Sequence, residues 1–223
     1  MFRILNVQFG TPRDISVLES KQANYEINDR TRFPIAVIDD EDFAYHDLLR
    51  RHDFQLTHFE DITDVRQLFD YPIVLCDVKG VGKHFESRFE GAHLMSEIKK
   101  RYPAKLIYGY TGNRFDASFN RYFSLCESVE PKDRELEDWI ELLDTAITHA
   151  NNPVFQWIKL RANLLVRRVP LYQITLLEDN YVTSIISNSK EFPSSSITRG
   201  LSSDIRQLIT DFAATVVAKL LTS

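Results

Sequence analysis

The sequence predicts an α/β fold, a doubly wound five-stranded parallel sheet, followed by a small all-α helical domain. Between residues 33 and 150, short apolar runs alternate with amphipathic segments. Alternation of this kind is typical of right-handed βαβ crossovers, which build a parallel sheet with helices on both faces. Beyond residue 150 only helical periodicity remains. Together these two patterns predict a sheet domain and a separate helical domain.

The strand-like runs are short and rich in β-branched and aromatic residues, as buried strands of parallel sheets are. They cover residues 35–39, 54–60, 72–77, 104–112 and 126–130. The segments between and after them have apolar residues at helical spacing and predict helices over 41–53, 61–71, 92–102, 115–125 and 134–150. The last of these is the most regular, because five apolar residues share one face: Leu136, Trp139, Ile140, Leu143 and Ile147.

Three parts follow from these patterns: an N-terminal arm at 1–32, a sheet domain at 33–150 and a helical bundle at 151–223. The arm contains a candidate edge strand at 2–9 and a short helix at 15–27, and we expect it to pack on one of the later domains. The bundle contains helices over 153–168, 171–188 and 204–221, with a polar linker at 190–203. Its first helix has an apolar stripe of Phe155, Ile158, Ala162 and Leu165. A bundle so small is often completed by a partner, which favours dimerisation or docking on another protein.

The charge is unevenly distributed along the chain. Residues 33–150 contain 14 Lys and Arg against 23 Asp and Glu, a net charge of −9, whereas residues 151–223 have a net charge of +3. An acidic sheet domain is a poor surface for gripping nucleic acid. The helix at 171–188 contains no Lys or Arg, so DNA binding through residues 151–223 remains only an alternative.

The two cysteines, Cys76 and Cys126, lie in apolar segments without zinc-ligand spacing, which predicts buried free thiols in a reducing compartment. No apolar run approaches 18 residues, and the first ten residues do not have the pattern of a secretory signal. We therefore expect a cytoplasmic protein with no membrane partner.

Polar residues that can do chemistry follow several of the predicted strands. Asp39 and Asp40 end the first, Asp77 the third, Thr111 the fourth, and Lys132 follows the fifth. Ligand sites of parallel sheets lie beyond the carboxyl ends of the strands, so these groups are expected to meet at one edge. Three carboxylates suit a hard divalent cation such as Mg²⁺, and a hydroxyl and an ammonium can hold phosphoryl oxygens. The set predicts phosphoryl transfer to a carboxylate nucleophile.

These motifs, taken in order, resemble the receiver domain of two-component response regulators. IAVIDDE at 35–41 is similar to the opening strand and acid pair of that family, and IVLCD at 73–77 to the strand that ends in the phosphorylated aspartate. KLIYGYTG at 105–112 resembles the strand that ends in Thr or Ser, and SVEPKD at 128–133 the strand that ends in lysine. The resemblance covers a little over half of the chain and implies the strand order 2-1-3-4-5.

The resemblance also implies a role for each residue. Asp77 would accept the phosphoryl group, with Mg²⁺ held by Asp39, Asp40, Asp77 and the backbone carbonyl of Lys79. Thr111 and Lys132 would contact the phosphoryl group as switch residues. A histidine kinase or another phosphodonor would be the partner. The protein would then be a signalling protein rather than an enzyme, beyond assisting its own phosphorylation and dephosphorylation.

The sequence departs from the family pattern at several places. Lys132 is followed by Asp133 instead of proline, and Val129 occupies the place of the usual switching aromatic residue. Tyr110 is a rival to Thr111 for the end of its strand. The segment after Asp77 is about six residues longer than in the family, and it is either a lid or partner contact or a solvated loop; its notable residues are Gly80, Gly82, Lys83, His84 and Arg88.

Two other functions compete with this interpretation. The first is a receiver-like scaffold that signals without phosphorylation. The second is an aspartate-nucleophile phosphatase, which requires a second aspartate two residues after the first, where this chain has Lys79. We therefore expect a response-regulator-like protein and keep the scaffold as the alternative.

Overall fold

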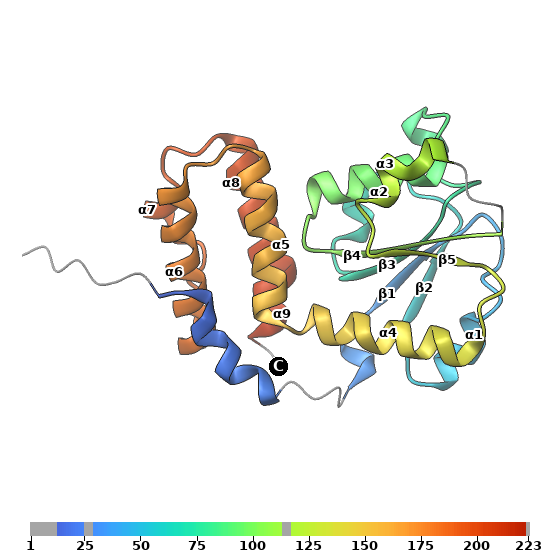
Figure 1. Ribbon diagram of the computed structural model, residues 1–223, viewed down its shortest axis with the longest axis horizontal. Helices are drawn as coiled ribbons and strands as arrows, with labels where there is room; N and C mark the ends of the chain where they lie inside the picture. The colour runs from blue at the N-terminus through green and yellow to red at the C-terminus, as the bar shows by residue number, and fades with distance from the viewer. Residues whose placement is uncertain (1–12, 25–28, 113–116, 222–223) are drawn as a thin grey trace, which may run out of the picture.

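The computed structural model describes residues 13–24, 29–112 and 117–221. Figure 1 shows a sheet with helices on both faces and, beside it, a group of long helices. The sheet has five parallel strands in the order β2-β1-β3-β4-β5. The strands are β1 Ile35–Ile38, β2 Leu56–Phe59, β3 Ile73–Asp77, β4 Leu106–Thr111 and β5 Ser128–Pro131. This order confirms the predicted fold class.

The central strands are apolar on both faces because both faces are covered. Every residue of β1 and β3 is buried. One face packs against α4, Leu136–Ala150, with Trp139 at the centre of that contact, and the other packs against α2, Glu90–Arg101. The register pairs Ile38 with Cys76 and Asp77 with Tyr110, so the carboxyl ends of β1, β3 and β4 lie level.

The shorter helices of this region differ from the predicted ones in length. α1 spans only His46–Arg51, because the residues just after β1 turn over the edge of the sheet, where the Glu41 amide donates to Asp39. The predicted helix at 115–125 is seen as η5 Ala117–Phe119 and α3 Asn120–Phe123, and its first two residues lie outside the described residues. The remaining short elements are η2 Arg30–Arg32 and η4 Lys83–Phe85.

The predicted α-helix at 61–71 is wrong. The structure has a single 3-10 turn, η3 Val65–Leu68, which begins with a capping box formed by Asp64 and Gln67. Two later carbonyls, those of Phe69 and Tyr71, accept hydrogen bonds from the buried ammonium of Lys105 at 3.0 and 2.7 Å. In addition, Tyr71 precedes Pro72, and a residue before proline disfavours the helical conformation. The segment therefore ends in a turn that leads into β3.

The helical region has its own core. It contains α5 Pro153–Val166, α6 Leu171–Ser187, α7 Ser195–Thr198, α8 Ser203–Phe212, a π-helical turn (η6) at Ala213–Val217, and α9 Ala218–Leu220. The predicted helix at 204–221 is therefore interrupted by a π turn, where the Thr215 hydroxyl donates to the Asp211 carbonyl. The arm contributes η1, Ile15–Asn24, whose Ile15 and Leu18 are buried in this same core. The candidate strand at 2–9 lies outside the described residues.

Helix α5 buries a different face from the stripe noted in the sequence. Its buried apolar residues are Val154, Trp157, Leu160 and Leu164. Ile158 and Leu165, which belong to the predicted stripe, are exposed, as are Val166, Leu171 and Tyr172 at the turn between α5 and α6. The helical region therefore presents apolar side chains to solvent at this turn.

The helical region packs against the amino edge of the sheet. Glu127, just before β5, pairs with Lys99 of α2 at 3.0 Å and with Lys159 of α5 at 2.7 Å. Arg101 of α2 pairs with Asp211 of α8 at 3.0 Å. The limits predicted for the three parts of the chain stay predictions.

Two further observations concern cysteines and membranes. Cys76 and Cys126 are both free, the first buried and the second half-buried. Among the described helices, none has the length and apolarity needed to cross a membrane.

Candidate functional site: an acidic pocket at the carboxyl edge of the sheet

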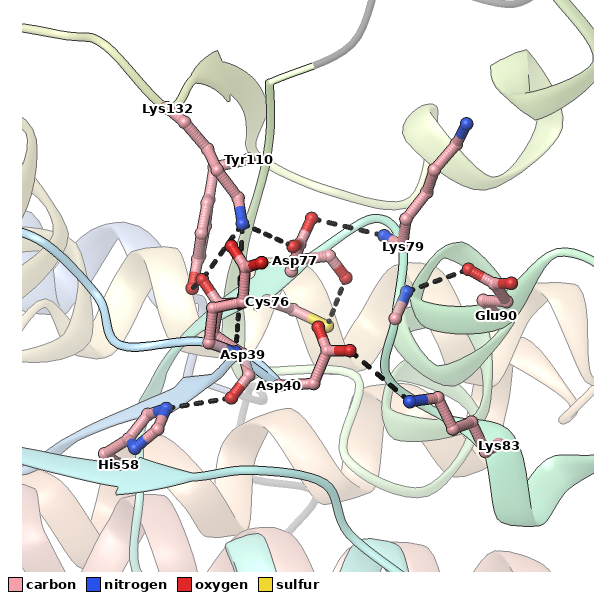
Figure 2. Close-up of polar contacts among 12 residues, drawn as sticks. Asp39, Asp40, His58, Cys76, Asp77, Lys79, Lys83, Glu90, Tyr110 and Lys132 are labelled. Atoms are coloured by element: carbon pink, nitrogen blue, oxygen red, sulfur yellow. Dashed lines mark hydrogen bonds and ion pairs between the residues drawn. The ribbon is translucent and has the colours of Figure 1, made fainter.

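Three carboxylates meet at the carboxyl edge of the sheet. Asp39 and Asp40 follow β1 and Asp77 is the last residue of β3. One oxygen of each lies within 4.8 Å of the others. We call these residues, with Lys132, the acidic pocket (Figure 2). The level ends of neighbouring parallel strands bring them together, as the sequence predicts.

Asp39 is the most enclosed of the three acids, with 1% of its surface exposed. Its carboxylate accepts hydrogen bonds from the Tyr110 hydroxyl at 2.8 Å and from the Glu41 amide at 3.1 Å. The Lys132 ammonium lies 3.2 Å from the same carboxylate. A buried polar group needs such partners, and together they fix the orientation of the Asp39 side chain.

Asp77 makes the shortest ion pair of the pocket. Its Oδ2 lies 2.6 Å from the Lys132 ammonium, and its Oδ1 accepts the Lys79 amide at 3.2 Å. Burial raises the pKa of Asp77 above its usual range, against the opposing effect of Lys132. Partial burial lowers the pKa of Lys132, but the hydrogen bond and the charge of Asp77, together with Asp39, outweigh burial, so the pKa is raised. Lys132 therefore contacts Asp77 although Asp133, and not the proline of the family pattern, follows it.

Asp40 faces outward. Its side chain is more than a third exposed, and it pairs with Lys83 of η4 at 3.3 Å. The backbone passes close beneath it, since a Cβ placed on Gly80 would lie 2.0 Å from the Asp40 Oδ1. Gly80 also has a φ of +83°, which favours glycine. The long segment after Asp77 thus lies against the pocket.

Tyr110, which the sequence pattern offers only as a rival to Thr111 for the strand end, is a residue of the pocket. It pairs with Asp77 across β3 and β4, and its buried hydroxyl donates to Asp39. Burial, followed by the charge of Asp39, raises the pKa of this phenol, so it stays a donor. Thr111 is the next residue and ends β4, where its backbone carbonyl accepts the Lys132 amide at 3.1 Å. The switch role of Thr111 stays a prediction, as does the ligand role of the Lys79 carbonyl.

The donor set fits a hard divalent cation. All three acids offer oxygen ligands, and their three negative charges exceed the single positive charge of Lys132. Mg²⁺ is bound by carboxylates together with water, so the two strands supply suitable groups. Of the three carboxylates, Asp77 is the one that the Lys132 ammonium contacts most closely.

Of three comparisons with known proteins, the search of solved structures returned similar proteins. A scan against family models and a search of curated proteins returned no match. A search of solved structures returned a receiver domain protein from Methanospirillum hungatei JF-1, at 17% identity and a TM-score of 0.40, covering 52% of this chain and 96% of that one. It also returned the signal receiver domain of an HD domain-containing protein from Pseudomonas fluorescens Pf-5, at 18% identity and a TM-score of 0.45, covering 53% and 96%.

The strand order and the helices on both faces decide the fold. The sheet, with the helices on its two faces, has the fold of a receiver domain. A third similar structure is a response regulator from Burkholderia pseudomallei with a phosphorylated aspartic acid, at 13% identity and a TM-score of 0.41, covering 68% of this chain and 92% of that one. At such low identity these likenesses concern the receiver fold, and the chemistry of this pocket depends on its own geometry.

Proposed function

We propose that this protein is a response-regulator-like signalling protein that accepts a phosphoryl group on Asp77. The observation that carries the proposal is the contact of Asp77 with Lys132 at 2.6 Å inside a cluster of three carboxylates. A fold alone does not specify a function, so the argument rests on this site.

The reaction would form an acyl phosphate. An oxygen of Asp77 attacks phosphorus, the bond from phosphorus to the leaving group of the donor breaks, and the leaving group departs with that electron pair. Lys132 would hold the oxygens of the transferred group, and the Lys79 amide would orient the carboxylate; the contacts of both with Asp77 support these roles. Asp39, Asp40, Asp77 and the Lys79 carbonyl would hold Mg²⁺, which supplies positive charge to the transferred group. Thr111 at the end of β4 would contact the phosphoryl group afterwards.

The output would pass through residues 151–223. The exposed apolar side chains at the turn between α5 and α6 support a role in homodimerisation or in binding another protein. The absence of Lys and Arg from α6 is the reason that DNA binding is not part of the proposal. A histidine kinase or another phosphodonor would act on the protein in the cytoplasm.

The test is to incubate the full chain with acetyl phosphate, with and without Mg²⁺, and to measure intact mass. We expect a mass increase of one phosphoryl group that requires Mg²⁺ and is lost in Asp77→Asn. Asp42→Asn is the matched control, because Asp42 is an exposed carboxylate two residues beyond Asp40 and outside the cluster. This variant should be modified as the wild type is.

The scaffold function predicts the opposite result. If neither acetyl phosphate nor beryllofluoride changes the wild-type protein in the presence of Mg²⁺, the phosphoacceptor proposal is wrong and the scaffold stands. A mass increase that persists in Asp77→Asn would also contradict the proposal.

A further inference from the structure

The segment between β3 and α2 brings a second lysine to the acidic pocket. Lys83 belongs to η4 and places its ammonium 3.3 Å from Asp40 Oδ2. In Figure 2, Lys83 and Lys132 approach the acids from opposite sides. Lys132 contacts Asp39 and Asp77, whereas Lys83 contacts Asp40. Each acid of the pocket therefore has a lysine partner.

Hydrogen bonds to the backbone set the position of Lys83. The carboxylate of Asp61, which follows β2, accepts the amides of Gly82 and Lys83 at 2.7 and 3.1 Å. Charge-assisted hydrogen bonds of this kind are stronger than neutral ones. Gly82 also has a φ of +77°, which favours glycine. The turn that presents Lys83 follows β3 in the chain, but these hydrogen bonds attach it to the segment that follows β2.

A second acid attaches the start of the same segment. Glu90, the first residue of α2, accepts the Gly80 amide at 2.8 Å. The backbone of Gly80 approaches Asp40 so closely that a side chain at residue 80 would collide with its carboxylate. The segment is therefore fitted to Asp40, in contrast to a solvated loop that passes the site by chance.

The contact has consequences for a cation. Asp40 belongs to the cluster that would hold Mg²⁺, and its Oδ2 already faces the Lys83 ammonium. A divalent ion among the three carboxylates would repel that ammonium. The cation and the Lys83 ammonium are both attracted to the Asp40 carboxylate, and because both are positive, each weakens the binding of the other.

We propose that Lys83 and the divalent cation compete for Asp40. This inference rests on the proposed metal-binding function of the pocket and adds a regulation to it. Without a cation, Lys83 is the internal counter-ion of Asp40. With a cation bound, Lys83 is displaced, so the affinity for the cation is set in part by the segment after Asp77.

The test is calorimetric titration of Mg²⁺ into the full chain and its variants. Because an exposed ion pair and a nearby charge are weak, we expect Lys83→Gln to lower the dissociation constant by roughly three- to ten-fold. Lys83→Arg keeps the positive charge, so its dissociation constant for Mg²⁺ should stay close to that of the wild type.

Arg88→Gln is the matched control, because it removes one positive charge from the same exposed segment. The Arg88 guanidinium lies over the Phe89 ring at 4.7 Å. We expect this variant to change the dissociation constant by less than about two-fold. Asp77→Asn establishes that the measured cation is bound in the pocket.

The outcomes separate this inference from the proposed function. If the wild type binds Mg²⁺ through Asp77 and Lys83→Gln binds it equally well, the competition is refuted and the metal site stands. Equal gains in Lys83→Gln and Arg88→Gln would reduce the effect to net charge and refute it too. If Lys83→Gln binds Mg²⁺ and neither the wild type nor Arg88→Gln does, the competition is supported. Binding by none of the folded proteins would overturn both the metal site and the competition.

Discussion

Two charged clusters lie at opposite edges of the same sheet, and they differ in the sign of their excess charge. At the carboxyl edge, three acids meet Lys132 and the more exposed Lys83. At the amino edge, Glu127 meets Lys99 and Lys159. The first cluster therefore has an excess of negative charge and the second an excess of positive charge. Strand β5 connects them, since Glu127 precedes it and Lys132 follows it.

The difference indicates what each cluster does. The amino-edge cluster joins α2, the start of β5 and α5, so its ion pairs hold the helical region against the sheet. Its single acid is shared by two cations. In the acidic pocket a lysine is shared by two acids, and negative charge is left over for a cation. The amino-edge cluster serves packing, whereas the acidic pocket has the unbalanced negative charge that the proposed cation site requires.

Removing an acid should therefore have unequal effects at the two edges. Glu127→Gln leaves Lys99, which is almost buried, without a counter-charge, and should lower the free energy of unfolding by about 3 kcal/mol. Asp39→Asn leaves Lys132 paired with Asp77 and relieves repulsion between acids, so its effect should stay within about 1 kcal/mol. Urea denaturation of both variants measures the difference. If both variants lose the same free energy of unfolding, the two clusters contribute equally to stability and the distinction between them is wrong.

Removing a lysine should distinguish the clusters by their response to Mg²⁺. Lys132→Met leaves Asp39 and Asp77 side by side without their cation, and should cost about 2 kcal/mol of stability in the absence of Mg²⁺. With the acidic pocket as the proposed cation site, added Mg²⁺ would bind the folded state alone and should recover much of that loss. Thermal unfolding with and without Mg²⁺ measures the recovery.

Lys159→Met is the control for that experiment. It removes a lysine from the amino-edge cluster and leaves the Lys99–Glu127 pair in place. Mg²⁺ should raise its melting temperature by the same amount as that of the wild type. A larger gain in Lys159→Met than in Lys132→Met would contradict the assignment of the acidic pocket as the cation site.

The fold and the acidic pocket were predictable because they depend on local patterns and topology. Alternating apolar runs define a parallel sheet, and a parallel sheet brings the residues after its strands to one edge. Asp39, Asp77 and Lys132 meet for that reason, although Asp133 in place of proline is unlike the family pattern. Each of these residues stands at or just after the end of a predicted strand, and that position is enough to predict that they meet.

Other features depend on contacts between distant segments, which periodicity does not encode. Where the apolar spacing at 61–71 indicates a helix, Asp64 and Gln67 cap a single 3-10 turn, and the following carbonyls of Phe69 and Tyr71 accept from the distant Lys105. Helix α5 has apolar residues on two sides, and only its packing decides that Trp157 is inside and Ile158 outside.

The amino-edge cluster and the position of Lys83 have the same origin. Lys99, Glu127 and Lys159 belong to three separate segments, and no local pattern connects them. The presence of two glycines near Lys83 was the only sequence signal of a close backbone approach.

The smallest expected effect is in the pH dependence, where the two clusters should have opposite signs. Although burial disfavours the Glu127 carboxylate, Lys99 and Lys159 hold its pKa below the usual value of 4.5. An acid with a lowered pKa stabilises the folded state above its unfolded pKa, and this stability is lost as the pH falls through the folded pKa. Asp77 has a raised pKa because of burial, so its ionisation opposes folding as the pH rises above 3.8.

Two variants isolate these contributions. The stability gap between wild type and Glu127→Gln should narrow by on the order of 1 kcal/mol when the pH is lowered from neutral to the range below 4.5. Asp77→Asn is neutral at every pH, so relative to wild type it should gain stability as the pH rises from 3.8 toward neutral. Denaturant titrations over this range, in the absence of Mg²⁺, measure both gaps. If Asp77→Asn instead loses stability relative to wild type as the pH rises, the pairing with Lys132 outweighs burial, and the acidic pocket is a structural ion pair like its counterpart at the amino edge.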